Sequence, residues 1–441
     1  MIRLQLPGMP IFVVVILALI IRIIVATTVS VNYPYQAGVL QKYLATAGFF
    51  EKYPNIRGYY DPEALKHCHG LYSETTWDLF YKCILRYTKN NRNPANRMLV
   101  DLPGYPMIIA LLHTITGSCD KKVILLFNAL LDTALLIIFF MIVKSTLGED
   151  IAILAALLYA ICPLQVFVGS GPHRDPYPAW ALLGVIFIEK KLEGNDLSAF
   201  LQGLIIGIGT WIRSLTIFFT PGIIVYMLFR KKYKHKYKHI VIFLLALIGP
   251  LLPWIYVNYV DYGKIFLTTL TGHALYIGLG RYPNPWGIKW KDECAFSKVH
   301  EIDLSVQPYT PKYNEIITRE AIGAILQHPI DFLEQSVAKL VNNLLLDAPW
   351  RITNGSRIFL LVLFFSVVGL IGIIKVMLKD VDDTLVLMLF GIITYILPLS
   401  ITFAQARHLL PVAIAYYVGA SIVIKDCFMS SLTARYSRKE G

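Results

Sequence analysis

Residues 215–257 read LTIFFTPGIIVYMLF, then RKKYKHKYKH, then IVIFLLALIGPLLPWIYV. Two apolar segments, 215–229 and 240–257, therefore flank a basic run at 230–239. Apolar stretches approaching about 20 residues are typical of helices that cross a lipid bilayer. Short loops rich in Lys and Arg face the cytoplasm. The pattern predicts two membrane-spanning helices joined by a cytoplasmic loop.

The composition extends this prediction to the whole chain. Hydrophobic residues make up 56% of the 441 residues. Charged residues make up 16%, against roughly 25% in soluble globular proteins. These values exclude an ordinary soluble enzyme, a disordered chain and a disulfide-dense secreted scaffold. They predict an all-α polytopic membrane protein with about ten spans, near 10–28, 123–143, 151–169, 177–189, 198–213, 215–229, 240–257, 357–378, 384–402 and 408–424.

The position of the basic residues orients these spans. The net charge is 41 − 29 = +12, but much of it falls in short loops on the same side as the run at 230–239, which suits anionic lipid headgroups rather than nucleic acid. Both termini are then cytoplasmic. This requires that segment 104–117 does not cross the membrane. Its apolar residues are too few for a span, so we expect a helix that lies in the outer membrane–water interface.

The predicted organisation has five parts. A first transmembrane helix at 1–28 is followed by an outer loop with juxtamembrane helices at 29–122. A central transmembrane bundle occupies 123–257, and a second large outer loop occupies 258–356. The C-terminal transmembrane helices and a cytoplasmic tail occupy 357–441.

Cysteine usage leaves the redox state open. Cys68 and Cys83 are the outer cysteines closest in sequence, and an outer compartment permits a disulfide. A bridge and free thiols are both compatible with the sequence.

Charged residues at predicted outer ends of spans are the candidates for chemistry, because charge at a membrane is costly. Arg174 and Asp175 lie in one outer loop, Arg213 at a second outer turn, and Arg407 with His408 at a third. Arg binds phosphate through a planar, permanently charged fork. Asp101 precedes the interfacial helix, and a carboxylate beside a phosphate site can act as a base. The pattern predicts that a lipid-phosphate headgroup is bound at the outer surface. The simpler alternative is that each Arg extends to the interface or pairs with a nearby carboxylate.

Several motifs, taken in order, resemble the GT-C glycosyltransferases of the glycosyltransferase 39, or dolichyl-phosphate-mannose-protein mannosyltransferase, type. The likeness runs over nearly the whole chain. The motifs are Pro103-Gly-Tyr-Pro-Met-Ile-Ile-Ala-Leu-Leu112, Asn128-Ala-Leu-Leu131, Arg174-Asp175, Gly207-Ile-Gly-Thr-Trp-Ile-Arg213, Pro253-Trp-Ile-Tyr-Val-Asn258 with Tyr262-Gly-Lys264, Gln327-His-Pro-Ile-Asp-Phe-Leu333 and Arg407-His-Leu-Leu-Pro411.

The resemblance implies a GT-C bundle and an EC 2.4 glycosyltransferase. Such an enzyme moves a sugar from a polyprenyl-phosphate carrier to a glycan, lipid or protein acceptor on the outer or lumenal face. It implies a multi-pass protein of the plasma or inner membrane, with no nucleic-acid partner. The expected donor-phosphate ligands share the outer level, and they are Arg174, Arg213, Arg407 and His408.

One departure concerns the catalytic acid. The family carries an acidic residue just after the first span, where this chain has Asn32 or Tyr33. An amide cannot act as a general base, so Asp101 or Asp175 is the expected catalytic carboxylate, with Asp101 preferred. Asn32, Tyr35 and Tyr105 are expected near the acceptor or as structural neighbours of the site.

Two other functions stay open: a lipid-linked-sugar flippase or transporter, and a divergent, non-catalytic GT-C member. A flippase would favour inverted repeats and broken helices at the midplane, and no internal symmetry is visible in the sequence. No cofactor is required with certainty, and no metal ligands are assigned, although a divalent metal (Mg or Mn) is compatible with the resemblance. The sugar, carrier and acceptor are not specified by the sequence.

Overall fold

The computed structural model describes residues 11–30, 102, 104–116, 121–306, 309–378, 382–402 and 404–437. Within these residues the chain is helical and contains no strand. The elements are α1 (Ile11–Ile24), η1 (Val25–Ser30), α5 (Gly104–Thr116), α6 (Lys121–Leu147), α7 (Glu149–Ile161), α8 (Pro163–Gly169), α9 (Tyr177–Leu192), α10 (Asp196–Ile212), η4 (Ser214–Phe219), α11 (Thr220–Phe229), α12 (Lys236–Ile248), η5 (Gly249–Leu251), α13 (Leu252–Tyr262), α14 (Thr271–Leu279), α15 (Asp292–Ile302), α16 (Pro311–Gln327), α17 (Pro329–Leu344), α18 (Ala348–Thr353), α19 (Phe359–Met377), α20 (Asp383–Ile401), η6 (Ala406–Leu409) and α21 (Leu410–Ser437).

Within the described residues, helices occupy most of each of the ten segments predicted to span the membrane. In the described part of the chain, six helices are long and apolar enough to cross a bilayer, and the pair α7 and α8 adds a seventh if it is one bent span. Helices Asp196–Ile212 and Ser214–Phe229 are apolar but shorter. The chain is therefore an integral, multi-pass membrane protein.

The bend between α7 and α8 has a local cause. The two helices meet at 61°, and Cys162 between them has an extended backbone, with φ −60° and ψ 123°. The next residue, Pro163, disfavours a helical conformation at the residue before it, and it has no N–H to continue the helix. Pro163 is also well placed as the first residue of α8, so the chain restarts in a new direction.

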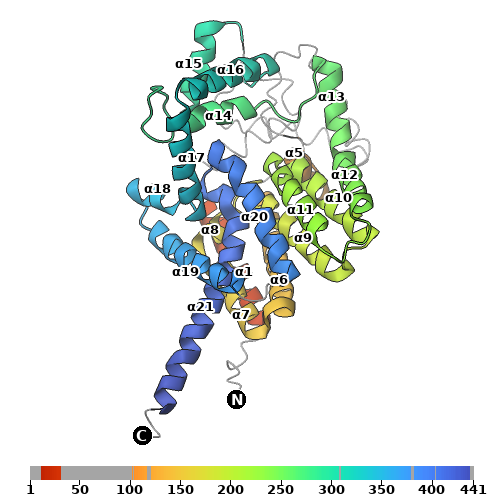
Figure 1. The fold of residues 1–441 in the computed structure, drawn as a ribbon, viewed down its shortest axis with the longest axis vertical. Coiled ribbons are helices and arrows are strands. Elements are labelled where there is room, and N and C mark those ends of the chain that lie inside the picture. The colour runs from red at the N-terminus through yellow and green to blue at the C-terminus, as the bar shows by residue number, and fades with distance from the viewer. Residues whose placement is uncertain are drawn as a thin grey trace.

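The bundle has two chemically different ends. At one end, Lys190 pairs with Asp382 at 3.4 Å and Arg230 pairs with Asp383 at 3.0 Å. The basic run at 230–239 also lies at this end, since Tyr233 donates a 2.5 Å hydrogen bond to the buried carboxylate of Glu189 in α9. The ends of α9 and α11 and the start of α20 therefore lie together. Figure 1 shows α14, α15 and α16 together beyond the opposite end, with α7 at the basic end.

Segment 258–356, which the sequence predicts to face outward and which is called the outer segment below, has its own hydrophobic core. This core is formed around α14, α15 and α16 by buried residues that include Leu279, Val299, Tyr313 and Ile317. The ring of His273 lies 2.6 Å from the hydroxyl of Tyr313. The second long loop of the prediction is thus a folded helical unit, and α17 runs from it towards the bundle (Figure 1).

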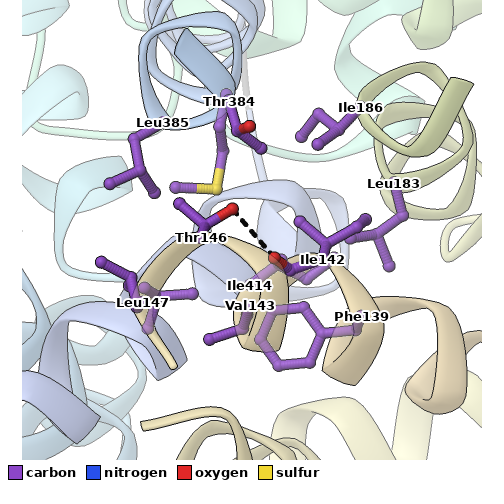
Figure 2. A pocket seen from close by; sticks show the side chains of 12 residues that line it. Phe139, Ile142, Val143, Thr146, Leu147, Leu183, Ile186, Thr384, Leu385 and Ile414 are labelled. Atoms are coloured by element: carbon purple, nitrogen blue, oxygen red, sulfur yellow. Dashed lines mark hydrogen bonds between the residues drawn. The ribbon is translucent and has the colours of Figure 1, made fainter. Parts of the chain in front are cut away.

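An apolar cavity lies at the basic end of the bundle, between α6, α9, α20 and α21 (Figure 2). The hydroxyl of Thr146, which lines it, donates to the carbonyl of Ile142 in its own helix. The cavity therefore offers few polar groups to a ligand, and it lies far along the bundle from the charged residues predicted to carry chemistry.

Candidate active site

The first part of the site is the connection at 170–176, between α8 and α9. It places Asp175 two residues before the start of α9, with the side chain 6% exposed. Asn128 of α6 holds this connection, because its amide nitrogen donates to the carbonyl of Gly171 at 2.7 Å. The same nitrogen donates to the hydroxyl of Tyr105 in α5 at 3.2 Å. Tyr105 therefore lies beside the connection, and it links α5 to it.

Arg213 is positioned by the end of α10. The helix stops at Ile212, and Arg213 is extended, with φ −142° and ψ 110°. The start of α5 packs on this end so closely that a Cβ at Gly104 would lie 2.6 Å from the carbonyl oxygen of Trp211. This close approach explains the glycine in the Pro-Gly-Tyr-Pro segment.

Arg407 and His408 lie in η6, the short turn before α21. Gln405 precedes the turn with an extended backbone, and its N–H donates to Nδ1 of His408 at 3.3 Å. The hydroxyl of Tyr395 in α20 donates to the carbonyl of His408 at 2.8 Å. The turn is therefore fixed from both sides.

These three connections meet on one carboxylate. Nη2 of Arg213 lies 2.9 Å from Oδ1 of Asp175, and Nε of Arg407 lies 3.1 Å from Oδ2. Nε2 of His408 is 3.1 Å from Nη2 of Arg213 and 3.8 Å from Oδ1 of Asp175. Residues 175, 213 and 407 are far apart in the chain, so the fold itself builds the cluster.

The charge balance of the cluster favours an anion. Burial alone would raise the pKa of Asp175, but the guanidinium groups of Arg213 and Arg407 together hold that pKa well below its usual range. Asp175 is therefore ionised, and each of its oxygens faces a cation. Two arginines on one carboxylate leave one positive charge in excess, and the Arg407 side chain is the most accessible of the three at 25% exposed.

His173 is a residue that the sequence reasoning missed. It lies in the same connection and is 6% exposed. Burial lowers the pKa of His173 to about 4, although the charge of Asp175 acts in the opposite direction. The ring is thus neutral near pH 7, and no described residue hydrogen-bonds to its buried Nδ1. Buried polar atoms are rarely left unsatisfied, and this is the signal that marks His173. Its neighbour Arg174 is also buried, at 4% exposed.

Other predicted residues fall elsewhere. Asp101, Asn32 and Tyr35 lie outside the described residues, as do Cys68 and Cys83. Within the described ranges, no group of three His, Cys, Asp or Glu side chains could hold a metal ion. Because Asp175 already faces two guanidinium groups, its oxygens do not fit a divalent cation, and no step is assigned to one.

Comparison with known proteins places this geometry in context. Residues 101–256 match the family described as dolichyl-phosphate-mannose-protein mannosyltransferase. The matched part contains Asp175 and Arg213. No curated protein matches the chain.

Two solved structures from Archaeoglobus fulgidus are similar in fold. The oligosaccharyltransferase in complex with zinc and sulfate has a TM-score of 0.50 at 13% sequence identity, with 95% of this chain and 49% of that chain covered. The oligosaccharyltransferase AglB in complex with an inhibitory peptide and a dolichol-phosphate has a TM-score of 0.52 at 12% identity, with 98% and 52% covered.

The chain has the GT-C fold. The expected fold class is therefore confirmed. The GT-C chain spans about half the length of the solved oligosaccharyltransferases that it matches. Asp175, Arg213 and Arg407 lie at the end of the bundle next to the outer segment. They come from the connections between α8 and α9, between α10 and η4, and between α20 and α21, respectively.

Proposed function

We propose that this protein is a membrane glycosyltransferase that moves a sugar from a polyprenyl-phosphate carrier to an acceptor on the outer or lumenal face. The observation that carries the proposal is the convergence of Arg213 and Arg407 on Asp175 at one end of a GT-C bundle. The mannosyltransferase-type match over 101–256 supports the same reaction class. The AglB structure, which holds a dolichol-phosphate, supports the same kind of carrier.

In this proposal the arginines bind the carrier phosphate. Arg407 is the more exposed of the two and makes the direct contact, because a guanidinium binds phosphate oxygens through paired N–H donors. Its charge also stabilises the carrier phosphate as the bond to the sugar breaks and negative charge develops on the leaving group. Arg174 and His408 lie beside this pair and complete the site.

Asp175 has a positioning role here. Its pKa is held low, and its two oxygens face Arg213 and Arg407, so it is a poor proton acceptor. We assign the base toward the acceptor hydroxyl or amine to Asp101, which remains a sequence-based proposal. His173, with a neutral ring, supplies a hydrogen-bonding group to the sugar or phosphate.

The orientation follows from charge. The end that carries Lys190, the run at 230–239 and Lys425 is proposed to face the cytoplasm, since basic loops remain on that side. The outer segment 258–356 and the arginine cluster then face outward. Both termini are cytoplasmic in this arrangement.

The test is transfer from a radiolabelled polyprenyl-phosphate sugar in isolated membranes. Wild type is compared with Arg407→Ala and with Lys425→Ala, which removes a partly exposed cation paired with Asp150 at the opposite end. The proposal expects transfer by wild type and by Lys425→Ala, and a large loss in Arg407→Ala. Equal transfer by all three proteins would show that Arg407 does not bind the carrier phosphate in the reaction. Movement of the intact lipid-linked sugar across the membrane without transfer would favour a flippase, and neither activity would favour a non-catalytic member.

A further inference from the structure

The outer segment contacts the Arg407 turn through a buried ion pair. Arg281 follows α14, and Asp347 precedes α18, and a guanidinium nitrogen of Arg281 donates to Oδ1 of Asp347. Arg281 is 2% exposed and Asp347 is completely buried. The guanidinium also lies 4.8 Å from the ring centre of Trp290, within the outer segment. Arg281 thus lies in the outer segment, whereas Asp347, between Leu346 and Ala348 of the bundle core, lies where that segment meets the bundle.

Both members of the pair reach across to the backbone before Arg407. Arg281 donates to the carbonyl of Ala404. Oδ2 of Asp347 accepts a hydrogen bond from the N–H of Ala406 at 3.1 Å. These two contacts flank Gln405, and Arg407 is the next residue in the chain after Ala406. Side-chain contacts of the outer segment therefore fix the backbone that carries the donor-phosphate ligand.

The surroundings keep Asp347 in place. Oδ1 also accepts from the amide of Asn342 at 2.8 Å, and Oδ2 accepts from Nε of Arg351 at 3.0 Å. Leu346 and Asp347 both have positive φ, 54° and 61°. Such a conformation is uncommon for non-glycine residues and persists where the surrounding structure imposes it. The carboxylate is therefore held in one orientation toward the turn.

We propose that Asp347 and Arg281 are positioning residues for Arg407, through which the outer segment sets the geometry of the phosphate site. This inference rests on the proposed binding of the carrier phosphate by Arg407. It makes the outer segment a part of the donor site, although its own side chains in this pair need not touch the donor. A partly exposed cation such as Arg407 gains affinity when its backbone is fixed before binding, because less ordering remains to be done.

The experiment measures binding of a sugar-free polyprenyl monophosphate to the purified full chain in lipid nanodiscs. The variants are Arg407→Ala, Asp347→Asn and the double variant. Asp347→Asn keeps the size of the side chain but weakens its contacts with Arg281 and the Ala406 N–H. We expect Asp347→Asn to weaken binding by roughly tenfold or more. We expect the double variant to bind no more weakly than Arg407→Ala alone, because the two changes remove the same interaction, that between Arg407 and the phosphate.

Thr310→Ala is the control for a general loosening of the outer segment. The hydroxyl of Thr310 caps α16 by accepting a hydrogen bond from the N–H of Tyr313. Because the loss of such a cap costs about 1 kcal/mol, we expect a lower melting temperature with unchanged affinity. A general loosening of the outer segment would instead lower affinity in Thr310→Ala as much as in Asp347→Asn, which would overturn the inference.

Ala406→Pro serves if Asp347→Asn does not fold. It removes the N–H that donates to Asp347 and leaves both charged side chains intact. Ala406 is the first residue of η6, where proline is tolerated, and Gln405 before it is already extended. We expect the same loss of affinity as in Asp347→Asn, and wild-type affinity in this variant would overturn the inference. If wild type itself does not bind the lipid phosphate, the proposed function fails. If Arg407→Ala loses binding while Asp347→Asn keeps it, only the positioning role fails.

Discussion

Arg22 in α1 and Asp132 in α6 form an ion pair of 2.6 Å in which both side chains are completely buried. Oδ1 of the same carboxylate accepts hydrogen bonds from Tyr159 at 2.7 Å, Gln165 at 2.7 Å and Trp180 at 3.0 Å. The pair therefore joins the first helix to α7, α8 and α9. Charges inside a membrane are costly unless paired, so this network fixes the position of α1.

Breaking this pair on one side should be strongly destabilising. We expect Arg22→Met to lower the free energy of unfolding by about 3–5 kcal/mol, because Asp132 is left as an unpaired buried charge. The double variant Arg22→Met/Asp132→Asn should recover most of that loss, because the Asn amide is neutral and its oxygen can still accept from Tyr159, Gln165 and Trp180. Thermal unfolding in detergent measures both. Lys375→Met is the control, since its pair with Asp426 is nearly half exposed and such pairs contribute about 0–1 kcal/mol. A double variant no more stable than Arg22→Met would contradict the expectation.

The contact between α19 and α21 should depend on glycine. A Cβ at Gly372 would lie 1.9 Å from the carbonyl oxygen of Gly419, and small residues allow such close helix packing in membranes. We expect Gly372→Ala to lower the melting temperature clearly. Gly323→Ala in α16 is the control, because no atom lies within 4 Å of its Cβ position. That change should stabilise by up to about 1 kcal/mol through helix propensity. Equal melting temperatures for the two variants would contradict this packing argument.

The sequence predicted the helices better than it predicted their partners. Apolar length and basic loops predicted about ten spans, and six of the described helices, or seven with the bent pair α7 and α8, are long and apolar enough to cross a bilayer. Three of the charged residues predicted at outer ends, Asp175, Arg213 and Arg407, lie together in the structure. The sequence did not predict that Arg22 and Asp132 form a pair. The two residues are 110 positions apart, and sequence periodicity carries no information on which helices lie side by side. A search for opposite charges within apolar spans would have found this pair.

The residues around the site illustrate the same limit. Asp347 and Arg281 lie in a segment that composition describes only as a polar loop. Their role depends on contacts with residues 404–406, about 60 and 120 positions away, so only the fold reveals it. His173 is adjacent to Arg174 and Asp175, but its importance depends on burial without a partner.

Asp175 should act by position rather than as a base. We expect Asp175→Asn to reduce both stability and lipid-phosphate affinity, because Arg213 and Arg407 lose the carboxylate that places them. A catalytic base would instead lower kcat and leave affinity unchanged. The pKa of Asp175 is held well below its usual range, so its stabilising ion pairs are present above the unfolded pKa of about 4 and are lost only in more acidic solution. Affinity and transfer measured from pH 5 to 8 should therefore show no step attributable to Asp175.

His173 should contribute to binding and little to stability. His173→Phe keeps a ring of similar size and removes the buried Nδ1, to which no described residue hydrogen-bonds. We expect an unchanged or raised melting temperature at pH 7, because a buried unsatisfied polar atom is removed. Affinity for the polyprenyl-phosphate sugar should fall, since the ring no longer hydrogen-bonds to it. A fall in melting temperature with unchanged affinity would mean that the imidazole has a structural role only.

Lys339 in α17 should make stability depend on pH. Its side chain is buried and its Nζ lies 3.5 Å from the carbonyl oxygen of Ile401. Burial, with a further contribution from the charge of Arg281, lowers the pKa of Lys339 from 10.5 to about 7. Above pH 7 the folded chain releases this proton while the unfolded chain keeps it, so this group makes stability rise with pH. Below pH 7 the cost of the buried charge is fully present.

We therefore expect Lys339→Met to raise the melting temperature most at pH 6 and least at pH 9. The control Lys264→Met, at an exposed ion pair, should leave the dependence of melting temperature on pH unchanged. If the melting temperatures of Lys339→Met and wild type differed by the same amount at every pH from 6 to 9, Lys339 would not titrate in this range.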